Sequence, residues 1–541
     1  MNNTSNTNSL NSRLNLIWHR IVYFLILILP FNHLLTQVLT GLIKSSKVST
    51  ISQATQFIQL ITLYKELLFI ILIFLMISQV IHSLIKKNTH SFQLKNILKS
   101  KSILIPLISL VSLLFFGILS TLQANLSLKL WMLGFRVELL WVIMLGVGLI
   151  WLRINEPRIN IKKILEYTRI SYVGILVIAI ISNLFGIERF YGFLGFKSGW
   201  ESNGLVLESP ICHGYGVEGG CRLTAGFSTP NNLAGYLLLV LPVLVIIFVQ
   251  QFQNSGLTQN LKTNLTLILK NQWQNIFLIV SCVVCIYFTY SRFALLALVL
   301  GSLWILKSWL INLNRLYKVS NSIKTIQKQW FRISNFNNVF NWGILLSPIL
   351  FLIIFLQLVS NSSLINNLPT AISRIGSSNG HYKLTSLSLE VIQNQFSNLI
   401  FSGYGLSQTG SIAKPQYQEV LNTRFVLENG ELAIKYQLPK YEISIPENWY
   451  LQMWLNGGLI YLLAFLSLLA FGLYPLFQGT NSTTATTNLF QDYKWWLALG
   501  VFMICIGNLF LHIWENPVIT FYFTIWILLI NCSKDQNLHK H

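Results

Sequence analysis

Long apolar runs alternate with short polar segments along most of the chain. A helix that crosses a bilayer needs about 20 mostly apolar residues, and such runs recur between residues 16 and 531. The pair 274–290 and 292–311 requires a very tight turn at TYSRF. We expect about 12 transmembrane helices, near residues 16–35, 66–85, 103–122, 132–152, 170–187, 231–249, 274–290, 292–311, 342–359, 449–474, 495–512 and 517–531.

Composition agrees with this pattern and sets the predicted domain organisation. Of 541 residues, 53% are hydrophobic and 10% are charged, and soluble domains carry about 25% charge. We therefore predict an all-α, polytopic membrane protein with one integral membrane domain over residues 16–531. Residues 1–15 are polar and low in complexity, so we expect a disordered cytoplasmic N-terminus. Residues 532–541 are expected to form a cytoplasmic tail.

The net charge of +21 reflects membrane topology rather than nucleic-acid binding. Basic residues concentrate in alternate loops between the apolar runs, which is the bias of cytoplasmic loops. These loops carry Lys86, Lys87, Lys95, Lys99, Lys101, Arg153, Arg158, Lys162, Lys163, Arg169, Arg315, Lys318, Lys324, Lys328 and Arg332. We expect no nucleic-acid partner.

The opposite loops hold most of the acidic residues, and two of these loops are long. They cover about 188–230 and 360–448, and neither contains a spanning apolar run. Long loops on one face of a membrane bundle commonly carry a functional site. Within the second loop, the apolar stripe of SLSLEVIQNQF predicts a helix along the membrane surface, which ends at the glycine-rich FSGYGLSQTG.

Two cysteines share the first long loop, in SPICHGYGVEGGC. Disulfides persist outside the cytoplasm, so we expect Cys212 and Cys221 to be bonded; the alternative is two free thiols. Cys282 and Cys285 lie within an apolar run without acids or histidines around them and are expected to be packing residues.

Arg222 precedes a predicted helix in CRLTAGFSTPNNLAGYLLLVLPVL. Ser228, Thr229, Pro230 and Asn231 form a favourable helix start. A helix N-terminus binds anions, and an arginine beside it adds a bidentate contact to phosphate. The segment therefore predicts a phosphate site at Arg222 and Asn231.

A second arginine, Arg292, falls between two apolar runs in TYSRFALLAL. An ionisable residue at that depth is a functional candidate, and the alternative for either arginine is a side chain that extends to the lipid headgroups. Two arginines on one face favour function over that alternative.

The segment PENWYLQMWLNGGLIYLLAFL opens another predicted span. Glu447 is either a favourable acid at a helix start or a general base at the membrane surface. Trp449 and Tyr450 are typical interfacial aromatics that could also stack on a sugar.

With these four segments the chain resembles the O-antigen ligase and O-antigen polymerase superfamily of bacterial membrane glycosyltransferases. The resemblance covers about residues 200–530. CRLTAGFSTPNNLAGYLLLVLP is similar to an Arg-x-x-Gly-Phe-x-x-Pro-Asn-x-x-Ala motif, although Gly226 comes four residues after Arg222. TYSRFALLAL resembles a Ser-Arg turn, HYKLTSLSLEVIQNQFSNLIFSGYG a helix leading to Gly-x-Gly, and ENWYLQMWLNGGLIYLL a segment that begins with histidine in many ligases.

The resemblance implies a GT-C-like membrane fold in the bacterial inner membrane, with an active site that faces the periplasm. The donor it implies is a polyprenyl-diphosphate-linked glycan, whose diphosphate Arg222 and Arg292 would bind. The acceptor is a glycan or a lipid-linked molecule, and the surroundings are membrane lipids. Glu447 stands where related ligases have the histidine that serves as proposed base.

Other candidates on the same face are weaker. Arg374 and His381, in SRIGSSNGHYK, either contact glycan or phosphate or are solvated loop residues. No Asp-x-Asp motif or His/Asp cluster occurs in the external loops, so we expect no metal and no other cofactor. Direct displacement by the acceptor predicts inversion at the anomeric carbon.

A flippase, a polymerase and a structural scaffold are the alternatives to a ligase. A flippase or exporter of lipid-linked oligosaccharide would also hold a diphosphate, but it needs polar groups through the bundle core. The predicted spans carry few charges, and Arg136 and Glu138, two residues apart, do not face each other on a helix and are expected to make separate interhelical contacts. A ligase and a polymerase differ only in the acceptor, and a structural scaffold would leave the long loops unexplained.

Overall fold

The computed structural model describes the apolar helices and part of the polar segments between them. It covers residues 4–45, 63–87, 101–124, 131–132, 134–155, 157, 159–194, 222–254, 261–306, 385–386, 388–406, 409, 425–426, 432–433, 437–438, 441–442, 448–478, 493–511 and 513–532.

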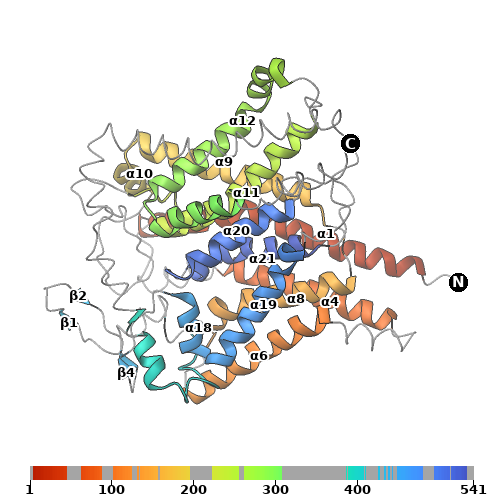
Figure 1. Ribbon diagram of the computed structural model, residues 1–541, viewed down its shortest axis with the longest axis vertical. Coiled ribbons are helices and arrows are strands. Elements are labelled where there is room, and N and C mark those ends of the chain that lie inside the picture. Colours follow the sequence, from red (N-terminus) through yellow and green to blue (C-terminus); the bar gives the residue numbers. More distant parts are fainter. Residues whose placement is uncertain are drawn as a thin grey trace, which may run out of the picture.

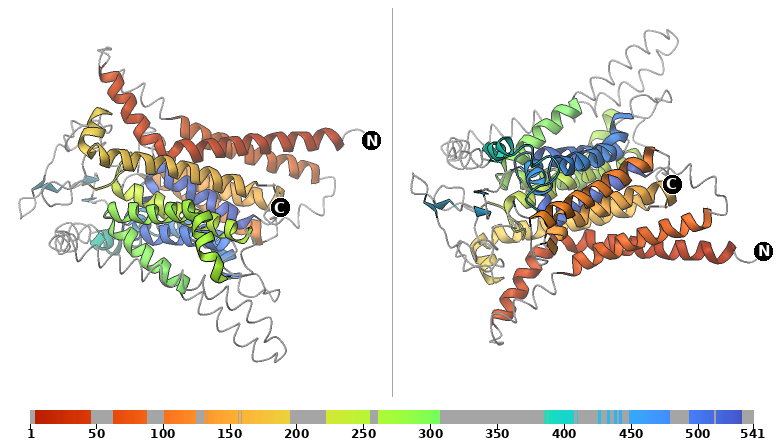
Figure 2. Two further views of the ribbon diagram at one scale, coloured as in Figure 1. Left: turned by 90° about the horizontal axis from the view of Figure 1, so that it is seen from above. Right: turned by 90° about the horizontal axis from the view of Figure 1, so that it is seen from below.

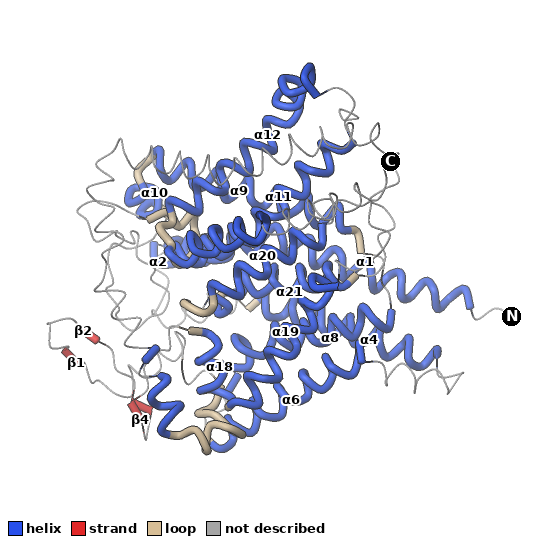
Figure 3. Tube along the Cα trace, viewed as in Figure 1, coloured by secondary structure: helices blue, strands red, loops and turns tan. Residues whose placement is uncertain are grey.

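Helices make up nearly all of this part of the chain (Figure 3). They are α1 Thr4–Ile28, η1 Leu29–Phe31, α2 Asn32–Ser45, α4 Tyr64–Lys87, α6 Lys101–Gln123, η2 Phe135–Leu139, α8 Leu140–Asn155, α9 Ile161–Leu184, α10 Ile187–Phe193, α11 Pro230–Asn254, α12 Leu261–Phe288, α18 Trp449–Gly457, α19 Leu459–Gln478, α20 Tyr493–Gly507, η5 Ile513–Glu515 and α21 Pro517–Asn531. A further apolar helix covers Arg292–Leu306. The strands are two short antiparallel pairs, β1 Phe425–Val426 with β2 Leu432–Ala433 and β3 Gln437–Leu438 with β4 Tyr441–Glu442.

The long helices run side by side along one direction of the molecule (Figures 1 and 2). α11 and α21 lie at the centre, and every residue of α21 from Val518 to Asn531 is buried. α8 packs on α4 and α6, α19 packs on α6, and α11 packs on α12 and α20. Large apolar side chains on the outer helices, such as Phe74 and Phe115, are exposed. This distribution is the one expected where lipid surrounds a bundle.

Six helical segments are long and apolar enough to cross a membrane. These are Ser12–Leu39, Tyr64–Ile85, Ile103–Gln123, Phe135–Asn155, Ile161–Leu184 and Pro230–Gln251. Shorter apolar helices cover Gln272–Phe288, Arg292–Leu306, Leu459–Tyr474, Tyr493–Gly507 and Pro517–Asn531. The prediction of a helical, membrane-type chain is confirmed at this level, and the predicted span 342–359 lies outside the described residues.

Among the predicted boundaries that differ from the observed ones, two have a clear physical cause. The segment 449–474 is not one helix, because it breaks between α18 and α19 at Gly458, whose φ is +89°. The span predicted at 170–187 begins at Ile161, where the Asn160 side chain accepts a hydrogen bond from the Lys163 amide at 3.1 Å and caps α9. Hydropathy alone missed this start because the first turns of α9 are charged.

Many helix termini gather at one end of the bundle, which we call the α10 end. Five elements begin there: α4, η2, α11, α18 and α21. α12 ends there, where its last residue, Phe288, contacts Leu223 in the short segment before α11. In Figure 1, α10 and the strand pairs lie on the left and α1 begins on the right. The basic residues Lys86, Lys87 and Arg153 lie toward the other ends of α4 and α8.

Candidate functional site

The segment before α11 forms the helix start that the sequence predicts. The Asn232 amide donates a hydrogen bond to the Thr229 hydroxyl at 3.1 Å, and the Asn232 side chain donates to the Ser228 hydroxyl at 2.8 Å. The chain reverses just before this cap, with φ of +45° at Ala225 and +85° at Gly226. Polar side chains therefore satisfy part of the α11 N-terminus.

The same segment is fixed against the neighbouring helices. The Leu223 amide donates to the Phe288 carbonyl at 3.0 Å, at the last residue of α12. Gly226 lies against Leu34 of α2, close enough that a β-carbon would meet that side chain at 3.2 Å. Tyr191 of α10 is buried nearby, and burial raises the pKa of its phenol above the ordinary value, with hydrogen bonds to Thr224, Ser182 and Gly226 opposing the shift. The phenol therefore stays protonated at neutral pH.

Arg222 forms hydrogen bonds both to the turn that follows α12 and to the start of α11. Its Nε donates to the Thr289 carbonyl at 2.7 Å, and one Nη donates to Asn231 Oδ1 at 3.1 Å and to the Tyr290 carbonyl at 3.4 Å. The Ser291 hydroxyl donates to the same Asn231 oxygen at 2.9 Å. These bonds keep the half-buried guanidinium in one orientation at the helix N-terminus.

The predicted tight turn at TYSRF is confirmed. α12 ends at Phe288 and the next helix begins at Arg292, with φ of +49° at Tyr290. Arg292 is exposed, whereas Phe293 is buried against Gly507 of α20. Since Arg222 binds the carbonyls of Thr289 and Tyr290, the two arginines belong to one structural unit, which we call the Arg222 centre: Arg222, Asn231, Ser291 and Arg292.

The start of α18 places its aromatic residues in the core. The Asn448 side chain accepts hydrogen bonds from the amides of Tyr450 and Leu451 at 2.9 and 3.1 Å and so caps the helix. Trp449 is fully buried with its ring 6.1 Å from that of Trp514, and the Tyr450 hydroxyl donates to the Cys505 carbonyl at 3.0 Å. Both rings thus have packing partners within the protein, and their stacking on a sugar stays a prediction.

The glycine-rich turn in FSGYG, residues 401–405, packs on α18 through backbone atoms. The Tyr404 and Gly405 amides donate to the carbonyls of Leu455 and Asn456 at 2.7 and 3.0 Å. A β-carbon at Gly403 would overlap the Asn456 carbonyl group. Two segments of the sequence resemblance, FSGYG and WLNGG, therefore meet in direct contact, and their glycines have a packing reason to be small.

Buried polar side chains around Asn456 also stabilise this contact. The Asn456 amide donates to Glu138 of η2 at 2.6 Å, and the Thr409 hydroxyl donates to Asn456 Oδ1 at 2.7 Å. Arg136, two residues before Glu138, instead pairs with Glu66 of α4 at 3.2 Å. The two η2 residues therefore make separate interhelical contacts, as predicted.

The loop between α20 and α21 contributes a carboxylate that sequence reasoning did not single out. Gln452 of α18 donates to Glu515 at 3.0 Å, and Asn516 caps α21 by accepting from the Val518 amide at 2.9 Å. A β-carbon at Gly235, one turn into α11, would meet Ile513 of the same loop at 2.9 Å. The sequence signal was the Asn-Pro pair after Glu515, which is typical of a capped helix start.

Several predicted site residues cannot be placed. Glu447, the predicted disulfide pair Cys212 and Cys221, and the loop residues Arg374 and His381 lie outside the described residues. Of the cysteines that are described, Cys282 and Cys285 are free and buried, as expected for packing residues. The proposed base therefore stays a prediction, although it directly precedes the Asn448 cap.

Comparisons with known proteins do not assign a family. A scan of protein-family models finds none that matches the chain, and a search of curated proteins finds no similar sequence.

Proposed function

We propose that the protein is a glycosyltransferase of a bacterial inner membrane, with about 12 spans in a GT-C-like arrangement and its α10 end toward the periplasm. It moves a glycan from a polyprenyl-diphosphate carrier to an acceptor hydroxyl, as an O-antigen ligase or polymerase does. The observation that carries the proposal is the Arg222 centre. In it, Arg222 contacts Asn231 at the N-terminus of α11, and Arg292 directly follows Ser291, which contacts the same Asn231.

This arrangement suits a lipid-linked diphosphate better than a soluble anion. The guanidinium group of an arginine matches phosphate oxygens, and a helix N-terminus adds favourable partial charge. The apolar helices around the centre offer a surface for the polyprenyl chain, and exposed Arg292 is the group that can approach the diphosphate without breaking the contacts of Arg222.

The proposed reaction is a single displacement. The acceptor oxygen forms a bond to the anomeric carbon while the bond from that carbon to the diphosphate oxygen breaks, and the hydroxyl proton passes to Glu447. The leaving diphosphate gains negative charge, which the arginines stabilise in the transition state. Because the attack is direct, the product has inverted configuration at the anomeric carbon.

The test uses the full chain in nanodiscs with a radiolabelled polyprenyl-diphosphate-linked oligosaccharide and candidate acceptors. A glycosyltransferase releases free polyprenyl diphosphate in proportion to glycosylated acceptor. In vesicles, a flippase moves the intact donor between leaflets and releases none. Transport without cleavage would contradict the proposal, and an acceptor that is itself lipid-diphosphate-linked would identify the polymerase form.

A further inference from the structure

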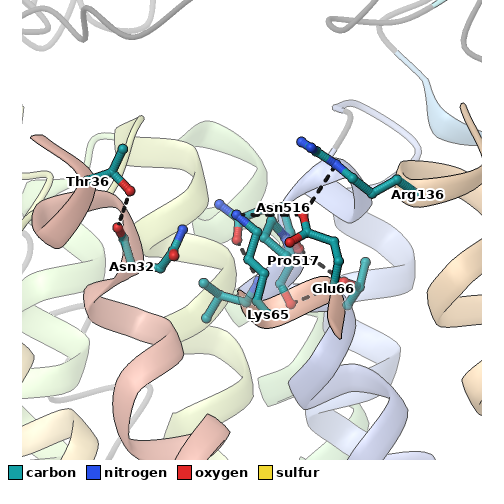
Figure 4. A network of polar contacts seen from close by, with 9 residues as sticks. Asn32, Thr36, Lys65, Glu66, Arg136, Asn516 and Pro517 are labelled. Carbon is teal, nitrogen blue, oxygen red and sulfur yellow. Dashed lines mark hydrogen bonds and ion pairs between the residues drawn. The ribbon is translucent and has the colours of Figure 1, made fainter. Parts of the chain in front are cut away.

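A second group of charges lies at the α10 end, at the start of α4 and in η2. It joins Lys65 and Glu66 of α4 to Arg136 of η2 (Figure 4). Figure 4 draws these residues near Asn516 and Pro517, at the start of α21. We call Lys65, Glu66 and Arg136 the Lys65 cluster.

The Lys65 cluster has one cation more than its carboxylate neutralises. Glu66 lies 3.2 Å from Arg136 Nε and 3.9 Å from Lys65 Nζ. The first distance fits a close ion pair, whereas the second is too long for a hydrogen bond. Lys65 is 9% exposed, and a charge that is so nearly buried is costly unless it is paired and hydrogen-bonded. The ammonium group of Lys65 therefore favours an additional anionic partner.

Arg136 is positioned to reach the same partner. Glu66 engages its Nε, and 41% of the Arg136 side chain is exposed. In Figure 4 the end of the guanidinium group extends past Glu66, away from α4. The planar end of an arginine is suited to two oxygens of one phosphate. The positive end of α21 lies beside the cluster and adds to the attraction.

The α20–α21 loop links this cluster to the first centre. Ile513 packs against α11 one turn after Asn231, and Figure 4 shows Asn516 near Lys65. Glu515 lies between Ile513 and Asn516 in the sequence and accepts a hydrogen bond from Gln452 of α18. The loop thus packs on α11 through Ile513, contacts α18 through Glu515, and leads into α21 beside Lys65.

We propose that the Lys65 cluster is a second phosphate-binding site, which holds the phosphate of a lipid-linked acceptor. The identity of this ligand as an acceptor rests on the proposed transferase function, with the donor diphosphate at the Arg222 centre. The chemistry recognised is a lipid phosphate or diphosphate at the membrane surface. Ordinary anionic phospholipid is the other source of this chemistry, and the test separates the two.

The binding test counts lipid diphosphates on the full chain by native mass spectrometry. The probe is a short-chain polyprenyl diphosphate, added to protein in phosphatidylcholine nanodiscs. We expect two bound molecules per chain, of which Lys65→Met removes one and Arg292→Gln removes the other. Lys65→Met keeps the side-chain stem and leaves the Glu66–Arg136 pair intact, and Arg136→Gln gives a second, independent loss. The control Arg153→Gln, at the opposite end of α8, should bind two.

Two other results decide against the proposed acceptor site. If Lys65→Met and Arg136→Gln still bind two molecules, the Lys65 cluster is a structural ion network. If phosphatidylglycerol in tenfold excess displaces the molecule that Lys65→Met removes, the cluster binds general anionic lipid and no acceptor.

Kinetics test the role and separate it from the proposed function. With a lipid-linked acceptor, Lys65→Met should raise the acceptor KM at least tenfold and leave the donor KM within about twofold. An equal rise in both KM values, or none, overturns the assignment to the acceptor. If the wild-type chain transfers no glycan, the proposed function fails, yet the loss of one bound molecule in Lys65→Met still identifies a phosphate site.

Discussion

Asn456 of α18 donates a 2.6 Å hydrogen bond to Glu138 of η2, and both side chains are 0% exposed. The bond joins segments 318 residues apart in the sequence. It also positions the amide whose oxygen accepts the bond from Thr409. This contact therefore fixes the wall of the α10 end where η2, α18 and the glycine-rich turn meet.

We expect Asn456→Ala to destabilise the protein by about 3 kcal/mol, because a buried carboxylate loses a donor and a cavity forms. Glu138→Gln keeps an oxygen that can accept the bond and removes a buried charge, so its cost should be about 1 kcal/mol or less. The measurement is the unfolding midpoint of the purified protein in detergent, with Glu166→Gln, at a partly exposed ion pair, as the control. Equal midpoints for Asn456→Ala and the control would contradict this role.

Gly403→Ala should prevent correct folding of the glycine-rich turn. Its β-carbon would overlap the backbone of Leu455 and Asn456, which cannot move without opening the α18–α19 junction. Gly117→Ala is the matched control, because its β-carbon would approach the end of the Tyr461 side chain at 3.3 Å. Fluorescence-detected size exclusion should find a monodisperse peak for Gly117→Ala and a several-fold loss of that peak for Gly403→Ala. A normal peak for Gly403→Ala would show that the two backbones do not pack this closely.

The two arginines of the Arg222 centre should differ in how their loss affects the protein. Arg222→Ala removes hydrogen bonds to Thr289, Asn231 and Tyr290, so we expect both lost transfer and a stability loss of about 2–3 kcal/mol. Arg292→Ala, at an exposed residue, should abolish transfer with little change in stability. Lysine at either position should restore transfer only in part, because a point charge does not reproduce the planar guanidinium group.

Arg189→Gln, an exposed arginine on α10, is the control for general loss of positive charge. Transfer rates and unfolding midpoints are measured on the same preparations. Wild-type transfer by Arg292→Ala would remove that residue from the diphosphate site, whereas an unchanged midpoint for Arg222→Ala would remove the structural role of Arg222.

Local signals in the sequence were enough to predict how the Arg222 centre is built. Ser228, Thr229 and Pro230 specify the start of α11 whatever surrounds them, and TYSRF is too short to be anything except a tight turn. Asn231 was expected beside Arg222 because both belong to the segment at that helix start. These elements depend on contacts between residues close in the chain or on strict limits of length.

Pairings between distant helices were not predictable in the same way. The i,i+2 spacing of Arg136 and Glu138 implies that they face different neighbours, but only the packing of η2 identifies these as Glu66 and Asn456. The break at Gly458 was missed because an average over apolar residues does not register one positive φ. Glu515 was missed because it adjoins two apolar runs and gains its significance from Gln452 in another helix.

Glu447, which precedes α18 in the sequence, and Glu515, which contacts α18 through Gln452, are two candidate bases that paired variants can separate. Glu447 directly precedes the Asn448 cap, whereas Glu515 is engaged by Gln452 within the fold. A base must exchange a proton with the acceptor, so Glu447→Gln should abolish transfer while the arginines still bind donor. Glu447→His should retain part of the activity, since imidazole also accepts protons near neutral pH.

Glu515→Gln keeps an oxygen that can accept the bond from Gln452 and serves as the matched control, because it removes a carboxylate at the same end of the bundle without removing the proposed base. We expect Glu515→Gln to retain most of the transfer rate, with donor binding by native mass spectrometry unchanged in both variants. The opposite pattern, with transfer lost in Glu515→Gln and kept in Glu447→Gln, would move the base to the α20–α21 loop. Glu447 would then be only a favourable acid at the start of α18.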